Sequence, residues 1–195
     1  MRKTAFYGNG GHAREIEIFM HSQVPIVKFV DSEYVDENSL DIKFLDVDNY
    51  NLLVAVGESK ARKQIIENKL PPSTNYLTFI HPTSIIGKNV TIGEGSYIGP
   101  YCIITDNIIL GKHALLNRGI HIGHDTNIGD YFSAMPGAII SGNCNIGECV
   151  YLGTNSSIRE KIMITNNVVI GLNSGVVKDI IKSGIYGGVP IKKIK

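Results

Sequence analysis

Residues 80–98 read IHPTSIIGKNVTIGEGSYI, and an isoleucine recurs there at every sixth position, at residues 80, 86, 92 and 98. The same spacing continues without a slip to Val176, and each of these positions is apolar. Glycine often follows the apolar residue, as at Gly87, Gly93 and Gly99, and a small or apolar residue often stands four positions after it. The regularity of this ladder decides the fold.

A repeat of six residues matches neither the period of a helix nor the alternation of an ordinary strand. It predicts a parallel β-helix of triangular cross-section, in which each hexapeptide supplies one short strand and one corner. Three hexapeptides then complete one coil of about 18 residues. We expect the large apolar residue to fill the interior, the small residue to pack beside it, and the glycine to relax the backbone at the corner.

The first 79 residues lack this repeat and alternate between strand and helix patterns. Strands are expected over residues 3–7, 24–30, 52–56 and 76–80, and helices over residues 13–20 and 59–70. This alternation predicts a small, Rossmann-like α/β head. Residues 33–51 show no clear pattern. We therefore divide the chain into an α/β domain, residues 1–79, and a β-helix domain, residues 80–195, which ends in a C-terminal tail.

A glycine loop, Gly8-Asn9-Gly10-Gly11-His12-Ala13, lies between the first predicted strand and helix. Such loops bind phosphate, because glycine lets the backbone approach and the helix start supplies N–H donors. The loop also fits the dinucleotide pattern G-x-G-x-x-G/A, and Asp31 follows at the end of the next strand, where a carboxylate meets a ribose or base. The pattern favours a nucleotide. A tight turn that needs glycine for its geometry is the alternative, and four strands are too few for both halves of a dinucleotide site.

A second loop, Val56-Gly57-Glu58-Ser59, follows the third predicted strand. Ligands of open α/β sheets bind outside the carboxyl ends of the strands, so Gly57 is a candidate contact. Arg62 and Lys63 follow on the next helix, and either could meet a phosphate or lie on a solvated face.

Three histidines, His113, His121 and His124, fall close together in the β-helix. The apolar ladder fills the interior, so these side chains must lie outside it. A zinc site is one interpretation, but His121 immediately precedes a ladder residue and points elsewhere around the coil than His124. No metal is expected.

His124 has Asp125 beside it and, by the stacking of coils, Asp106 and Gly142 on the same corner in the adjacent coils. A histidine oriented by a carboxylate is a candidate general base. A glycine one coil along would leave room for a substrate and offer a backbone N–H to a developing oxyanion. An exposed polar corner without chemistry is the alternative.

Four stretches carry a resemblance to a known family: Tyr7–Ala13, Gly123–Asp130, Pro136–Ala138 with Gly142, and Gly187–Lys192. In these stretches the chain resembles bacterial sugar acyltransferases of the sialic-acid O-acetyltransferase family, which includes N-acetyltransferases of nucleotide-linked amino sugars. The resemblance covers essentially the whole chain. It implies a left-handed β-helix, a homotrimer with active sites between subunits, acetyl-CoA bound along the β-helix, and a sugar nucleotide held by the head.

The resemblance also implies roles for individual residues. His124 matches the base and Asp125 the acid that raises its basicity. Ser133 stands where several members carry a second histidine that touches the acetyl thioester. The implied substrate contacts are Gly10, Gly11, His12, Asp31, Gly57 and Asn117, and the implied acetyl-CoA contacts are Gly142, Thr154, Gly171 and Leu172, with Ser133.

The activity expected from the loop, the corner and the resemblance is transfer of an acetyl group from acetyl-CoA to an amine. The expected acceptor is a UDP-, dTDP- or GDP-linked 4-amino-4,6-dideoxy sugar used in bacterial surface glycans. O-acetylation of sialic acid or a related sugar hydroxyl is the alternative. A nucleotide-sensing oxidoreductase, favoured only by the G-x-G-x-x-A match, and a purely structural solenoid are the alternatives that are not acetyltransferases.

Bulk composition sets limits on partners. The chain has 195 residues and a formal net charge of +1, which gives no electrostatic case for nucleic acid or for an anionic membrane. No apolar run approaches the length of a membrane helix, so no membrane insertion is expected. The three cysteines form no Cys-x-x-Cys pair, which favours a reducing, cytoplasmic location.

Overall fold

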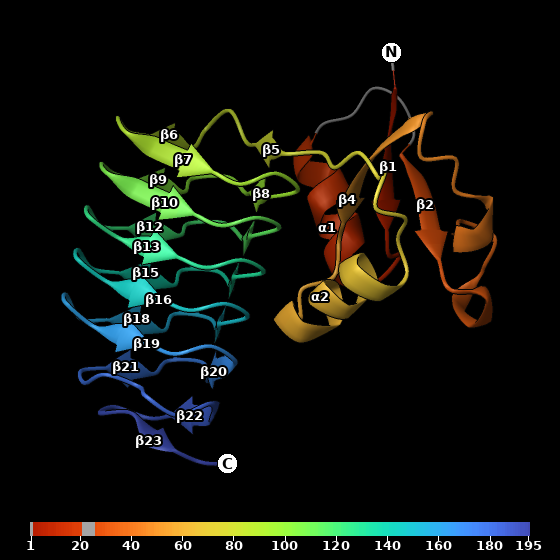
Figure 1. The fold of residues 1–195 in the computed structure, drawn as a ribbon. Coiled ribbons are helices and arrows are strands. Elements are labelled where there is room, and N and C mark those ends of the chain that lie inside the picture. The colour runs from red at the N-terminus through yellow and green to blue at the C-terminus, as the bar shows by residue number, and fades with distance from the viewer. Residues whose placement is uncertain (1, 21–25) are drawn as a thin grey trace.

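The computed structural model describes residues 2–20 and 26–195, and in it a small α/β head packs against one side of a long β-helix (Figure 1). The head is a four-stranded parallel sheet of order β3-β2-β1-β4 with two helices. Its elements are β1 (Lys3–Tyr7), α1 (Gly11–Met20), β2 (Val27–Val30), a 3-10 helix (Ser32–Tyr34), β3 (Leu40–Asp41), a 3-10 helix (Ile42–Phe44), β4 (Tyr50–Val54) and α2 (Ser59–Asn68).

Most of the predicted head elements are confirmed, with shifted ends. The strand expected over residues 24–30 is β2, and residues 24 and 25 lie outside the described part of the chain. The strand expected over 52–56 begins and ends two residues earlier. The strand expected over 76–80 is wrong in its first half, because Tyr76 forms a single bridge to Leu52 and the strand begins at Phe79. The unpatterned segment contains β3 and both 3-10 helices.

The β-helix has three parallel faces, as the six-residue period predicts (Figure 1). The first face, nearest the head, holds β5 (Phe79–Ile80), β8 (Tyr97–Ile98), β11 (Leu115–Leu116), β14 (Ser133–Ala134), β17 (Tyr151–Leu152), β20 (Val168–Ile170) and β22 (Gly184–Gly187), with β23 (Lys192–Lys193) antiparallel at its end. The second face holds β6 (Ile85–Ile86), β9 (Ile103–Ile104), β12 (His121–Ile122), β15 (Ile139–Ile140), β18 (Ser157–Ile158) and β21 (Gly175–Val176). The third face holds β7 (Val90–Ile92), β10 (Ile108–Leu110), β13 (Asn127–Ile128), β16 (Asn145–Ile146) and β19 (Met163–Ile164).

The pairing register confirms the predicted coil. Ile122 pairs with Ile104 in the coil before it and with Ile140 in the coil after it. The ladder is buried from Ile98 to Val176 and forms one continuous apolar core. Ile80 at its start is 40% exposed, because no earlier coil covers it.

The role that we expected for the glycines after the ladder residues is wrong. The left-handed backbone that favours glycine falls three positions after the ladder residue and is adopted mainly by other residues, such as Asn107 and Asp125. The glycine directly after the ladder residue instead faces the next coil. A Cβ added at Gly93 would lie 2.5 Å from the backbone nitrogen of Lys112. These glycines therefore set the spacing between coils rather than the corner conformation.

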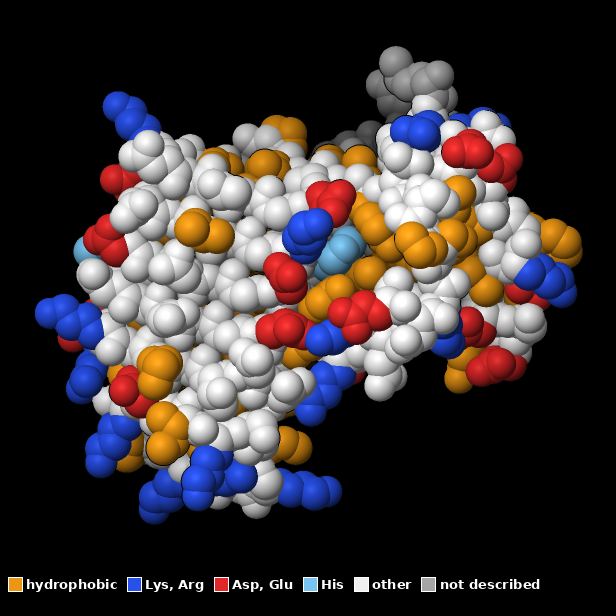
Figure 2. Space-filling model, viewed as in Figure 1, with side chains coloured by type: hydrophobic (Ala, Val, Ile, Leu, Met, Phe, Trp, Pro, Cys, Tyr) orange, Lys and Arg blue, Asp and Glu red, His pale blue; other side chains and the backbone are white. Residues whose placement is uncertain are grey.

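Head and β-helix share apolar contacts. Phe6, Ile16 and other residues of the head sheet and α1 cluster with Tyr97 and Leu115, which point outward from the first face. On the α2 side, Ile65 clusters with Tyr131 and Cys149 of the β-helix corners. The two parts meet without an open gap on the face drawn in Figure 2.

Candidate active site

The predicted base lies on an exposed corner of the β-helix. His124 follows β12, its side chain is 62% exposed, and its Nδ1 lies 2.7 Å from Asp125 Oδ2. Asn107, one coil earlier, donates to Asp125 Oδ1 over 2.6 Å. The hydrogen bond from Asn107, and then the one with His124, hold the pKa of Asp125 below its usual value. The carboxylate is therefore ionised at neutral pH and orients the imidazole.

Gly142 lies directly against the imidazole ring. A Cβ at this position would be 2.8 Å from His124 Nε2 and 2.9 Å from Cε1. The space that we expected a glycine to leave for substrate is thus filled by the ring itself. The backbone nitrogen of Asn143 donates to the His124 carbonyl over 2.7 Å, so the next coil fixes the corner as well.

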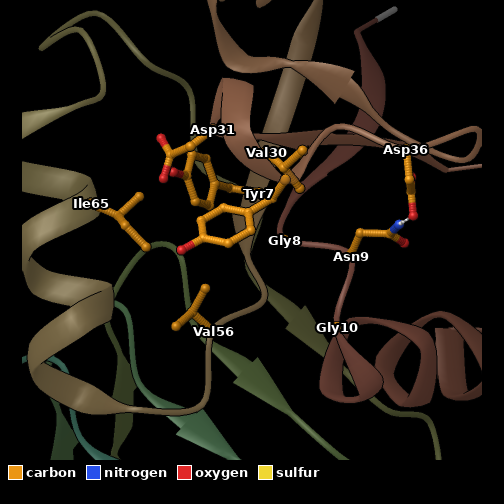
Figure 3. A pocket seen from close by; sticks show the side chains of 10 residues that line it. Tyr7, Gly8, Asn9, Gly10, Val30, Asp31, Asp36, Val56 and Ile65 are labelled. Atoms are coloured by element: carbon orange, nitrogen blue, oxygen red, sulfur yellow. Dashed lines mark hydrogen bonds between the residues drawn. The ribbon is translucent and has the colours of Figure 1, made fainter.

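The head contains a cavity of about 400 Å³ at the carboxyl ends of β1, β2 and β4 (Figure 3). The strand order reverses between β1 and β4, which is where open α/β sheets bind ligands. The size suits a nucleoside-sized ligand. The cavity is lined by Tyr7, Gly8, Asn9, Gly10, Val30, Asp31, Tyr34, Asp36, Val56 and Ile65.

Two carboxylates stand at this cavity. Asp31 accepts a hydrogen bond of 2.6 Å from Lys69 Nζ. Burial is the largest single influence and raises the pKa of Asp31, but the hydrogen bonds from Lys69 and Tyr7 together with the charge of Lys69 lower the pKa overall. Asp36 accepts from the Asn9 amide over 2.7 Å. Both carboxylates are acceptors, which suits ribose hydroxyls or a base N–H. Gly11, the first residue of α1, is not among the lining residues.

A second cavity, of about 370 Å³, lies between the head and the first face of the β-helix. His12, Gly57 and Glu58 line it from the head, and Met135, Tyr151 and Val169 from the β-helix. Burial lowers the pKa of His12, and its buried Nε2 has no hydrogen-bond partner. The ring is therefore neutral at physiological pH, with one nitrogen left for a ligand.

Glu15 of α1 joins two predicted substrate contacts. Its Oε2 lies 3.6 Å from His12 Nδ1 and accepts from the Asn117 side-chain amide over 3.3 Å, while Oε1 pairs with Arg118. His12 from the head and Asn117 from the β-helix are thus brought together. Glu15 was not among the predicted site residues, although its place three residues after His12 puts both side chains on one helix face.

Arg62 has a different place from the one that we expected. It neither meets a phosphate site nor lies on a solvated face, because it is 1% exposed and buried at the junction of the head and the β-helix. Its Nε donates to the His113 carbonyl over 2.9 Å, and Nη2 donates over 2.9 Å to the Tyr131 carbonyl and over 2.8 Å to Ser133 Oγ. Further acceptors are the carbonyls of Val56, Gly57 and Phe132. Burial lowers the pKa of Arg62 to about 10.

Ser133 belongs to the same junction. It is fully buried, and its hydroxyl donates to the Gly57 carbonyl over 2.8 Å while accepting from Arg62. In this arrangement the hydroxyl proton is already used within the chain. The contact of Ser133 with acetyl-CoA stays a prediction.

The predicted acetyl-CoA residues fall on two edges of the second face. Thr154, Gly171 and Leu172 follow β17 and β20, on the edge that the second face shares with the first. Gly142 and His124 follow β15 and β12, on the opposite edge. The structure therefore brings the first three together and sets them apart from the base.

The remaining histidines have structural surroundings. His113 is buried under the head, stacks on Tyr131 at 5.5 Å and meets the edge of Tyr76. Burial lowers the pKa of His113 to about 4. His121 is exposed in β12. Across residues 2–20 and 26–195, no group of three or more His, Cys, Asp or Glu side chains is placed to hold a metal ion. No helix in the same ranges has the length and apolar character needed to span a membrane.

Comparisons with known proteins agree with this architecture. Residues 3–69 match the model of the PglD N-terminal domain, and residues 78–106 match that of the bacterial transferase hexapeptide (six repeats). The UDP-N-acetylbacillosamine N-acetyltransferase of Bacillus subtilis (strain 168) is 28% identical over 112 residues, which are 50% of this chain and 51% of that protein. The chain therefore spans about half the length of this curated relative. A second curated relative is matched over a smaller share of its length, 14%.

Solved structures match over the whole chain. The acetyltransferase domain of PglB from Neisseria gonorrhoeae FA1090, in complex with acetyl coenzyme A, is 26% identical, with a TM-score of 0.85 over 99% of both chains. PerB from Caulobacter crescentus, in complex with CoA and GDP-perosamine, is 22% identical, with a TM-score of 0.88 over 100% of this chain and 98% of that one. The head and the repeats together define a hexapeptide-repeat acyltransferase. Within that class, the chain is similar to the PglD-like acetyltransferases.

Proposed function

We propose that this protein transfers an acetyl group from acetyl-CoA to the amine of a nucleotide-linked amino-dideoxy sugar, for the synthesis of bacterial surface glycans. The observation that carries the proposal is the His124–Asp125 pair on an exposed corner, with a bond of 2.7 Å, in a chain whose head holds a nucleotide-sized cavity. The relative from Bacillus subtilis is named for such an acceptor, and the PglB domain was solved with acetyl coenzyme A. No metal takes part in the proposed reaction.

In the proposed mechanism, the Nδ1–H of His124 donates a hydrogen bond to Asp125, so that Nε2 carries the free lone pair. The acceptor amine attacks the thioester carbonyl, and Nε2 takes the proton that the amine loses. The Gly142 backbone N–H stabilises the tetrahedral oxyanion. As the C–S bond breaks, the CoA thiolate leaves and receives the proton from His124. An amine is already a good nucleophile, so no covalent enzyme intermediate is needed.

The proposed substrate contacts follow the two cavities. The nucleotide lies in the head cavity, with Gly10 and Asp31 on its wall and Gly11 at the start of α1. The sugar reaches the second cavity, where Gly57 lies on the wall and His12 Nε2 has no hydrogen-bond partner within the chain. Asn117 is linked to His12 through Glu15. Acetyl-CoA lies along the second face, against Thr154, Gly171, Leu172 and Gly142, with Ser133 as the least exposed of the proposed contacts.

We further propose a homotrimer of left-handed β-helices with active sites between subunits. In one chain, β12 on the second face separates the corner of Asn117 from the corner of His124. The Asn117 corner, which meets the head through Glu15, and the base therefore lie at opposite edges of that face, and a neighbouring copy would bring a base to the sugar. Exposed Ile85 and Ile139 on the second face offer apolar surface for such packing. The use of acetyl-CoA and the three free cysteines favour the cytoplasm.

The test is a panel of UDP-, dTDP- and GDP-linked 4-amino-4,6-dideoxy sugars, with sialic acid beside them, assayed for CoA release. We expect release with one class of amino-sugar nucleotide. Release with sialic acid alone would favour the O-acetyltransferase. With the acceptor that supports CoA release, His124→Ala should lower kcat/KM by about 100-fold or more, with the fold verified by circular dichroism. Retention of most of the wild-type kcat/KM would remove His124 as the base.

A further inference from the structure

Charge is segregated along the β-helix. The whole chain has a net charge of +1, yet residues 171–195 carry five lysines and a single acidic residue, Asp179. The lysines are Lys178, Lys182, Lys192, Lys193 and Lys195, and each is exposed. Figure 2 shows blue side chains gathered at the end of the β-helix that carries β22 and β23, at the bottom of the view. The balanced net charge of the chain conceals this basic end.

These five lysines have no acidic partner among residues 2–20 and 26–195. The lysines in ion pairs belong to other parts of the chain: Lys28, Lys43, Lys63, Lys69 and Lys112. Asp179 accepts a hydrogen bond from the Met163 backbone nitrogen over 2.9 Å and so caps a strand. The positive charge at this end is therefore uncompensated within the described chain.

Aliphatic side chains stand among these lysines. Val189 is 75% exposed, Ile181 and Ile194 are each 70% exposed, and Ile185 is 41% exposed. Ile194 is next to Ile185, because its backbone nitrogen donates to the Ile185 carbonyl over 2.7 Å. Val189 lies over Gly175 of the second face, and Ile181 lines a hollow with Met163 of the third face. We call these four aliphatic residues and the five lysines the basal patch.

We propose that the basal patch docks the end of the β-helix on an anionic bilayer surface. Lysines near a membrane are attracted by acidic headgroups, and aliphatic side chains between them can enter the boundary between headgroups and acyl chains. A nucleic acid would use the lysines but offers no apolar surface to four exposed aliphatic side chains. A second copy docked end to end would bring two sets of lysines together, which like charge disfavours. The docking is peripheral, since it needs no spanning helix.

The test is flotation of the full chain with vesicles of phosphatidylcholine, with and without phosphatidylglycerol. We expect the protein to bind only the vesicles that contain phosphatidylglycerol, and to be released from them as the salt concentration is raised. The triple variant Lys192→Glu, Lys193→Glu, Lys195→Glu should bind about 100-fold more weakly or worse, the loss expected for three lysines at an anionic surface. Ile181→Ser with Ile194→Ser should also weaken binding, without changing its salt dependence.

A matched control makes the same charge change elsewhere. Lys3, Lys60 and Lys88 are exposed and lie outside the basal patch, so Lys3→Glu, Lys60→Glu, Lys88→Glu should keep wild-type vesicle binding. Equal loss in this control would reduce the effect to net charge and overturn the proposal. So would an absence of wild-type binding, or tighter binding to duplex DNA than to the vesicles. A basal triple variant that raises KM for acetyl-CoA but floats normally would reassign the lysines to the phosphates of CoA. Circular dichroism and Tm of each variant verify the fold.

Discussion

Replacing Arg62 by methionine should destabilise the protein more than any surface substitution. The side chain is 1% exposed, and its donors meet five backbone carbonyls and one hydroxyl. The carbonyls of Val56, His113 and Tyr131 take no other hydrogen bond among the described residues. Methionine has a similar length and no donor, so these three carbonyls would be left buried and unpaired.

Each unpaired carbonyl costs about 1–3 kcal/mol, and loss of the buried cation relieves part of the total through its own desolvation. We therefore expect the free energy of unfolding to fall by about 3–5 kcal/mol, in the range found when buried charged networks are broken. For a chain of this length, the loss corresponds to a Tm lower by about 6–20 °C. Lysine should recover little of this, because one ammonium group cannot reach carbonyls that lie in three separate stretches.

Thermal and urea unfolding, followed by circular dichroism, measure the effect. Arg159→Met is the matched control, because Arg159 is exposed and its side chain makes no hydrogen bond in the described structure, so stability should change by less than about 0.5 kcal/mol. If Arg62→Met unfolds within about 1 kcal/mol of the wild type, the junction is held by apolar contact and the reasoning fails.

Three further substitutions test the proposed site. Gly142→Ala places a Cβ 2.8 Å from His124 Nε2 and should displace the ring, lowering kcat about 100-fold with little change in Tm; an unchanged kcat would show that the ring position is not critical. Asp125→Asn keeps a hydrogen bond but loses the negative charge, so kcat should fall about 10- to 100-fold while KM for acetyl-CoA stays constant, and steady-state kinetics separates the two. Glu15→Gln removes the charge beside His12 and should raise KM for the sugar nucleotide more than it lowers kcat; an effect on kcat alone would contradict a substrate-positioning role.

The fold was predictable because one physical requirement repeats. A ladder residue must enter the core at every sixth position, so each coil is specified by its own continuous stretch of sequence. The role of the glycine after the ladder residue was misinterpreted. A glycine can be required by a left-handed backbone torsion or by the close approach of a neighbouring coil, and the sequence does not distinguish the two causes. Gly93 belongs to the second kind, with Lys112 one coil away.

The site was predictable where its chemistry is local and unpredictable where two domains meet. His124 and Asp125 are adjacent in sequence, so their hydrogen bond followed from the corner alone. Arg62 and Glu15 both reach from head helices to the β-helix, and their partners on the β-helix lie at least 51 residues away in sequence. Helical periodicity shows which face of a helix is apolar but not which domain covers the helix. The buried Arg62 was therefore predicted to face solvent or to bind a phosphate.

Most of what Arg62 recognises on the β-helix is main chain. Backbone carbonyl groups are present whatever the side chains are. The coils that contact this arginine can therefore vary in sequence without losing these hydrogen bonds. A gene that exchanged its head by recombination near the end of α2 would keep this junction, provided that the incoming second helix carried an arginine in the same place. Such an exchange would bring a new head cavity to an unchanged His124 corner, and under the proposed function this would be a short evolutionary route from one acceptor to another.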